Sequence, residues 1–276
     1  YGGKGNDILS SGVGDDEIYG EGGNDTLVIN GSGTQLFNGG AGNDTIQLDL
    51  SNWSLNLNPN FDQVIEVNLL TGTSGQKGNT SLRDRLVGIE NIEFIGSYDT
   101  ELIGDDNDNI IIGGEGTDTI TTGLGSDVIV IRAGDSSSTL ETTDRITDFE
   151  DGSDVIGMAG VNFSDFEKSQ GTGNYASHTI LSISGEFVAI LENTTVTNIN
   201  QDDFIVSPTY KATFATSINK WQSDGNGAGM NEPIIKLHRK DITDEVGIDL
   251  IPKGDGQAGH KHKPDMDKGN YELRVE

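Results

Sequence analysis

Aspartate recurs at a fixed place in glycine-rich rows of nine residues near the start of the chain. Residues 2–10 read GGKGNDILS, 11–19 read SGVGDDEIY, 20–28 read GEGGNDTLV and 39–47 read GGAGNDTIQ. Each row has Gly at its fourth position, Asp at its sixth and an aliphatic residue at its eighth. Calcium is a hard ion that takes about six to eight oxygen ligands. Because a glycine-rich turn exposes backbone carbonyls and the Asp adds a charged oxygen, the rows predict calcium-binding turns.

The same frame returns in the middle of the chain. Residues 95–103 read IGSYDTELI, 104–112 read GDDNDNIII, 113–121 read GGEGTDTIT and 122–130 read TGLGSDVIV. Within the first block, the degraded row INGSGTQLFN carries one extra residue. A single Gly-Asn-Asp would indicate only a tight turn. Asp in the same phase over six rows indicates a repeat architecture instead.

One turn cannot surround a calcium ion, so we expect two turns stacked one coil apart to share it. Two rows make one coil of 18 residues. Asp7 and Asp25 are 18 residues apart, as are Asn109 and Asp127. Asp25 and Asp44 are 19 residues apart, which the extra residue explains.

The other side of the coil offers mixed pairs. There we expect Asp16 to face Thr34, and Thr100 to face Asp118. Since each of these pairs has only one carboxylate, its site should bind calcium weakly or not at all.

Each row divides into a turn of six residues and a short strand whose middle residue points inward. The inward residues would stack into an aliphatic ladder made of Leu9, Ile18, Leu27, Ile46, Ile111, Ile120 and Ile129. Such a core is thin, so apolar burial alone should leave the coil marginally stable.

Composition agrees with a carboxylate array that needs cations. The chain has 45 acidic and 17 basic residues, a net charge of -28, and no Cys. This charge disfavours nucleic acid and anionic membranes as partners. Low hydrophobicity with high charge is also typical of disorder, but disorder does not place acids in register. Because an extracellular protein without disulfides needs another source of stability, bound metal ions are the obvious candidate.

The remaining segments have other patterns. Residues 1–47 and 95–136 hold the two repeat blocks, and 48–94 is expected to be an irregular β segment between them. Residues 137–206 should form a β-rich cap over the last coil. Residues 207–276 predict a small β-sandwich or part of one. No apolar run is long enough for a membrane span, and the start inside a repeat suggests a fragment.

Rows such as GGKGNDILS, GGAGNDTIQ and GGEGTDTIT resemble the nonapeptides of RTX proteins. This resemblance implies an all-β fold, a right-handed parallel β-roll (β-solenoid) with bound calcium. It also implies export by the type I secretion machinery and folding outside the cell in millimolar calcium. The segment DRITDFEDGSDVI with the later DDFIV resembles the region after the roll in serralysin-like proteins.

Carried over by position, the resemblance implies carboxylate ligands and turn residues that offer backbone oxygens. The carboxylates are Asp7, Asp16, Asp25, Asp44, Asp118 and Asp127. The turn residues are Gly3, Gly5, Gly12, Gly14, Gly20, Gly23, Gly40, Gly42, Asn107, Asn109, Gly114, Gly116, Gly123 and Gly125. Thr34, Thr100 and Asn109 depart from the pattern, which puts the sites around them in doubt.

Motifs for catalysis are missing from the sequence. There is no HExxH, no GxSxG and no Cys nucleophile. His260 and His262 are better explained by an exposed polar loop than by a metal site. Asp224-Gly-Asn226 begins like an EF-hand loop, but Ile235 stands where the loop needs Glu. We therefore expect no enzyme here, with any catalytic domain outside this fragment.

Three functions remain open. The fragment is expected to be a calcium-dependent folding and export module of a secreted bacterial protein. Alternatively, it belongs to a surface-associated adhesin, surface layer or filament and self-associates. In a third reading it is the repeat module of a polysaccharide-acting enzyme such as an alginate epimerase, although Trp53 and Trp221 are its only tryptophans.

Overall fold

The computed structural model describes residues 1–50, 59–132, 136–159, 163–206, 249–252 and 271–274. The chain forms two compact units, Tyr1–Lys211 and Ala212–Glu276. In the second unit, β21 (Asp249–Pro252) pairs antiparallel with β22 (Tyr271–Arg274). Most of the predicted sandwich, with its three histidines and Trp221, lies outside the described residues, as does Trp53.

One sheet of the first unit is parallel throughout. Its eight strands lie side by side in chain order: β2 (Ile8–Ser10), β4 (Thr26–Ile29), β6 (Thr45–Asp49), β10 (Asn91–Ile95), β12 (Ile110–Ile112), β14 (Val128–Arg132), β16 (Val155–Ala159) and β20 (Phe204–Val206). Every neighbouring pair in this sheet is parallel.

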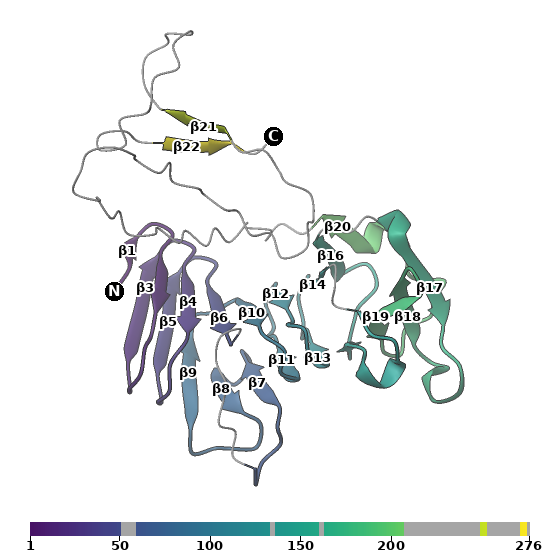
Figure 1. Cartoon of the computed structure of the whole chain (residues 1–276), viewed down its shortest axis with the longest axis horizontal. Helices are drawn as coiled ribbons and strands as arrows, with labels where there is room; N and C mark the ends of the chain where they lie inside the picture. The colour runs from purple at the N-terminus through teal and green to yellow at the C-terminus, as the bar shows by residue number, and fades with distance from the viewer. Residues whose placement is uncertain (51–58, 133–135, 160–162, 207–248, 253–270, 275–276) are drawn as a thin grey trace, which may run out of the picture. The chain divides into compact units, whose positions relative to one another are not determined.

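The second sheet has twelve strands, and the first unit alternates between the two sheets along most of its length (Figure 1). Its order is β1 (Gly3–Lys4), β3 (Glu17–Gly22), β5 (Leu36–Ala41), β9 (Arg83–Val87), β8 (Thr73–Gln76), β7 (Ile65–Asn68), β11 (Thr100–Ile103), β13 (Asp118–Thr121), β15 (Arg145–Ile146), β19 (Glu186–Leu191), β18 (Thr179–Ile183) and β17 (Phe166–Gln170). Short 3-10 turns lie at Leu140–Thr142, Phe163–Asp165, Gly173–Tyr175 and Gln201–Asp203. The predicted parallel β-roll is therefore confirmed.

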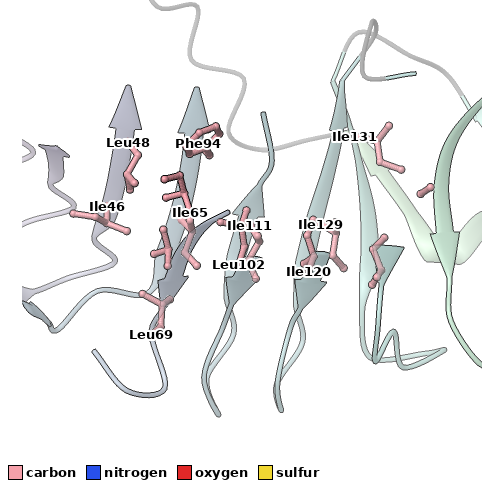
Figure 2. Packing of buried hydrophobic residues seen from close by; sticks show 14 of the residues in the cluster. Ile46, Leu48, Ile65, Leu69, Phe94, Leu102, Ile111, Ile120, Ile129 and Ile131 are labelled. Carbon is pink, nitrogen blue, oxygen red and sulfur yellow. The ribbon is translucent and has the colours of Figure 1, made fainter. Parts of the chain in front are cut away.

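The core is a ladder of single aliphatic and aromatic residues between the two sheets, as Figure 2 shows for ten labelled members. Leu27, Ile46 and Ile111 are fully buried, and Ile129 is 1% exposed. The predicted ladder is confirmed, with Leu9 only partly buried at the first coil. A strand contributes only one or two inward residues, such as Ile46 and Leu48 of β6, which keeps the core thin.

The segment between the repeat blocks is more regular than expected. Strands β7 and β8 are extra members of the second sheet, whereas β6 pairs directly with β10 in the first. Strands β9 and β10 form one more coil of the roll, with one strand in each sheet. Leu86 is aligned with Phe37, and Ile92 is aligned with Ile46. An ion pair from Arg83 to Glu66 joins β9 to β7.

The roll also continues past residue 136. Strands β15 and β16 extend the two sheets, and the antiparallel strands β17–β19 follow β15 at the end of the second. Phe204 of β20 packs on Phe163 and Phe166, with ring centroids 5.0 and 5.1 Å apart. These larger side chains cover more apolar surface than a repeat row could.

The ladder should dominate the stability of the roll. Leu27 is fully buried, whereas Ile8 on the neighbouring strand is 79% exposed. We expect Leu27→Ala to lower the free energy of unfolding by about 2–5 kcal/mol in saturating calcium. Ile8→Ala should change it by less than about 0.5 kcal/mol. Urea unfolding of both variants checks this, and similar losses would mean that the ladder is not the core.

Candidate metal centre

Turn carboxylates hold successive coils together through backbone amides. The amide N of Asp7 donates to Oδ1 of Asp25 at 2.8 Å, and that of Asp25 donates to Oδ1 of Asp44 at 2.7 Å. The amide N of Asn109 donates to Oδ1 of Asp127 at 2.7 Å. Asp25, Asp44 and Asp127 thus each use one carboxylate oxygen to bind the backbone of the coil before them.

The other carboxylate oxygen has no donor. Oδ2 is buried and without a hydrogen-bond partner in five residues of the described chain, which are Asp7, Asp25, Asp44, Asp118 and Asp127. Four of the five side chains are at most 1% exposed, and Asp7 at the first coil is half-buried. A buried charged oxygen without a partner is costly, so five in one register indicate a missing positive group.

A second oxygen approaches each of several such carboxylates. A Cβ added to Gly20 would lie 2.2 Å from Oδ2 of Asp25 and 2.4 Å from the carbonyl oxygen of Gly39. The same point beside Gly2 is 2.8 Å from Oδ2 of Asp7 and 2.9 Å from the carbonyl oxygen of Gly20. Two acceptors converge on one small space, which suits a cation and explains why the row begins with Gly.

Burial makes the ionised carboxyls unfavourable without a cation. Desolvation raises the pKa of Asp127 to about 7, and the negative charge of Asp154 adds to the shift. Desolvation also raises the pKa of Asp44 and of Asp118 above the ordinary value of 3.8. Calcium at these oxygens would restore the ionised form.

Most of the predicted turn residues lie on the turns between the sheets, whereas Gly3, Gly20 and Gly40 lie within β1, β3 and β5. Nine of them have φ in the left-handed region: Gly3, Gly5, Gly12, Gly14, Gly23, Gly40, Gly42, Gly123 and Gly125. Turn glycines also allow close stacking, since a Cβ on Gly42 would lie 2.0 Å from the carbonyl oxygen of Gly23. Gly114 and Gly116 likewise pack against the carbonyls of Gly96 and Tyr98. Coordination by their carbonyls stays a prediction.

One predicted pair is wrong by one residue. Asp16 lies opposite Gln35 and not Thr34, because Glu17 pairs with Leu36. The amide N of Thr34 instead donates to Oδ1 of Asp15 at 2.9 Å. The register is fixed by Phe37, whose burial opposite Ile18 places the extra residue of the degraded row before it.

The other mixed pair is confirmed. The amide N and Oγ1 of Thr100 both donate to Oδ1 of Asp118, at 3.0 and 2.6 Å. Oδ2 of Asp118 remains without a donor.

Four acidic residues outside the rows occupy the same place in the ladder and were not predicted. They are Asp84, Glu90, Asp144 and Asp154, and they accept from the amide N atoms of Gln35, Asp44, Asp118 and Asp127 at 2.9, 2.7, 2.9 and 3.2 Å. A signal was present in the sequence. Each precedes a buried Leu or Ile by two residues, as the Asp of a complete row does.

Residues 1–28, 29–52 and 94–129 match the family model described as RTX calcium-binding nonapeptide repeat, which holds four copies. The chain carries RTX calcium-binding repeats. The matched segments cover less than half of the chain and end at residue 129, so the likeness of the later segment to serralysin-type proteins stays a prediction. A comparison with curated proteins finds no match.

Solved structures that resemble this chain include a lipase and an epimerase subunit. One is an extracellular lipase, LipA from Serratia marcescens, with 14% identity, a TM-score of 0.26 and coverage of 74% of this chain. The other is the AlgE6R3 subunit of the Azotobacter vinelandii mannuronan C5-epimerase, with 18% identity and a TM-score of 0.26, covering 84% of this chain and 93% of the subunit. The chain spans 38% of the length of the lipase.

Calcium fits the donors present in the RTX repeats. The unpartnered groups are oxygens, which a hard cation prefers to nitrogen or sulfur. Within the described ranges, no three His, Asp or Glu side chains gather as a metal cluster. An ion here would therefore use backbone carbonyls beside one or two carboxylates. No helix among the described residues has the length and apolar character to cross a bilayer.

The raised pKa values predict how the calcium-free roll responds to pH. A carboxyl whose pKa is higher in the folded than in the unfolded state stabilises the fold below the unfolded value of 3.8. That stability is lost as pH rises through the folded value, about 7 for Asp127. With chelator present, circular dichroism should show more β signal at pH 5.5 than at pH 8. An equal or weaker signal at pH 5.5 would contradict the assigned burial.

Proposed function

We propose that residues 1–206 form the calcium-dependent folding module of a secreted bacterial protein that the type I machinery exports unfolded. The observation that carries the proposal is the row of buried Asp Oδ2 atoms without donors. In the unfolded chain water solvates these oxygens, and in the folded chain a cation must replace that water whenever the carboxyls are ionised. Folding therefore waits for calcium, which is scarce inside cells and abundant outside.

The export part of the proposal follows from this coupling. A chain with a net charge of -28 and a thin core stays extended when calcium is scarce, and an extended chain can pass a narrow conduit. Calcium binding on the far side would then draw the equilibrium toward the roll. In our proposal these residues carry no catalytic site, and the adhesive and polysaccharide-acting alternatives stay predictions.

Circular dichroism of the full chain tests the coupling. In excess chelator the spectrum should be that of a largely unfolded chain, and millimolar calcium should produce β signal that further chelator removes. Magnesium at the same concentration is the control, since it keeps its waters and demands tighter geometry. A spectrum that is the same with and without calcium would refute calcium-driven folding.

A further inference from the structure

We propose that the coil between the repeat blocks closes one more calcium site with Asp44, and that the side-chain amide of Asn109 replaces the ion at the next coil. This inference rests on the proposed calcium binding of the roll. The coil is formed by β9 and β10, and the family match leaves residues 53–93 outside the repeats.

Asp44 has the same surroundings as Asp25. Its Oδ2 is fully buried and has no donor. A Cβ added to Gly39 would lie 2.4 Å from this Oδ2 and 2.1 Å from the carbonyl oxygen of Gly88. The corresponding distances beside Gly20 are 2.2 and 2.4 Å, to Asp25 and Gly39. The pair of converging oxygens is therefore preserved, with Gly88 in the role that a repeat glycine has elsewhere.

Glu90 supplies the second carboxylate of this site. The alignment of Ile92 with Ile46 places Glu90 opposite Asp44, and the amide N of Asp44 donates to its Oε2 at 2.7 Å. Only Gly88 and Ile89 separate β9 from Glu90, so the turn is shorter than in a repeat row. The longer side chain of Glu90 reaches the amide that an Asp would reach from a full turn. A cation between Asp44 and Gly88 would also offset two neighbouring negative charges.

Asn109 breaks the series one coil later. Its Nδ2 donates to the carbonyl oxygen of Glu90 at 2.8 Å and to Oδ1 of Asp105 at 3.2 Å. Its Oδ1 accepts from the amide N of Asp105 at 2.8 Å. The side chain is 1% exposed, and both of its polar atoms are engaged.

The amide group thus does at this turn what a cation does at the others. A Cβ added to Gly104 would lie 2.3 Å from Oδ1 of Asn109 and 2.1 Å from the carbonyl oxygen of Thr122, so the cradle has the usual shape. Here, however, the carboxamide brings its own N–H donors, which bind a carbonyl and a carboxylate directly. Asp105 is further held by the amide N and Nδ2 of Asn107, at 2.8 and 3.0 Å. The turn needs no ion.

Two substitutions with opposite effects test the proposal on the full chain. Native mass spectrometry in saturating calcium counts the bound ions. Glu90→Gln keeps the acceptor for Asp44 but removes a charge, and it should lower the count by one. Asn109→Asp removes the donors and creates a carboxylate, and it should raise the count by one. Either variant with the ion count of the wild type overturns the proposal.

Matched controls separate charge from position. Asn24→Asp adds a carboxylate to an exposed turn position whose side chain already accepts from Asn43, and Glu21→Gln removes an exposed charge. Both should leave the count unchanged, and a count that follows these charges would also overturn the proposal. A wild type that binds no calcium would refute the proposed function instead.

If a variant does not fold, a measurement on the wild-type protein tests the same proposal. Anomalous diffraction from calcium-bound crystals should show a peak between Oδ2 of Asp44 and the carbonyl oxygen of Gly88, and none beside the side chain of Asn109. A peak at Asn109, or none at Asp44, would overturn the inference.

Discussion

Asp25→Ala is expected to raise the calcium concentration at the folding midpoint at least about tenfold, while Asp16→Ala should change it by less than about twofold. A tenfold change corresponds to about 1.4 kcal/mol. This free energy is close to the smallest contribution expected from a hydrogen bond to a charged group, which is about 1.5–3 kcal/mol. The loss of bound calcium would add to it.

The two positions differ in burial and in neighbours. Asp25 is 1% exposed, lies between Asp7 and Asp44, and has an Oδ2 without a donor. Asp16 is half-buried, faces Gln35, and is not among the residues with a buried unpartnered oxygen. Removing Asp25 therefore affects two adjoining sites, and removing Asp16 affects a site that lacks a second carboxylate.

Calcium titrations followed by circular dichroism measure both midpoints. Asp25→Asn is the matched control for shape, because it keeps an acceptor for the amide N of Asp7. It replaces the other, charged oxygen with an NH₂ group, which cannot bind calcium. It should lie close to Asp25→Ala if the charge matters most. Equal midpoints for the Asp25 and Asp16 variants would count against the register of the roll.

Gly20→Ala should prevent one calcium site from forming, whereas Gly22→Ala in the same row should be tolerated. The new Cβ at position 20 would lie 2.2 Å from Oδ2 of Asp25 and 2.4 Å from the carbonyl oxygen of Gly39. At position 22 the nearest atoms, both carbonyl oxygens, are 3.9 and 4.0 Å away. Since a backbone carbonyl cannot move far in a packed ladder, we expect a loss of about 2–3 kcal/mol at position 20.

Urea unfolding in saturating calcium gives the stability of the two glycine variants, and native mass spectrometry gives their ion counts. Gly20→Ala should lose one ion relative to Gly22→Ala. If the two variants have the same stability and the same count, the space beside Gly20 is not a metal cradle.

The structure of the repeats could be predicted in detail because the residue type at each position of a row determines the local conformation. Gly fixes where the chain turns, Asp fixes which oxygen faces the next coil, and the eighth residue fixes which side chain is buried. Ile46 and Asp44 were placed correctly from these rules alone. These rules did not predict that Gln35 lies opposite Asp16. The sequence shows that the degraded row has one extra residue, but it does not show at which position of the row that residue is inserted.

Contacts between residues that are far apart in the sequence could not be predicted from the rows. Strands β6 and β10 pair although more than forty residues separate them. The local pattern around Glu90 can mark it as a turn carboxylate but does not indicate that its partner is Asp44. Asp144 and Asp154 follow the local rule for the turn carboxylate but stand outside any glycine-rich row. Their places depend on strand pairing, which the buried Ile146 and Ile156 determine.

The central claim is that the buried Asp oxygens without donors are calcium ligands. An anomalous difference map from crystals grown in calcium tests it most directly. We predict peaks within about 2.3–2.6 Å of Oδ2 of Asp25, Asp44 and Asp127, each also contacted by backbone carbonyl oxygens. A well-ordered roll whose map shows no peak beside any of these oxygens would contradict the claim.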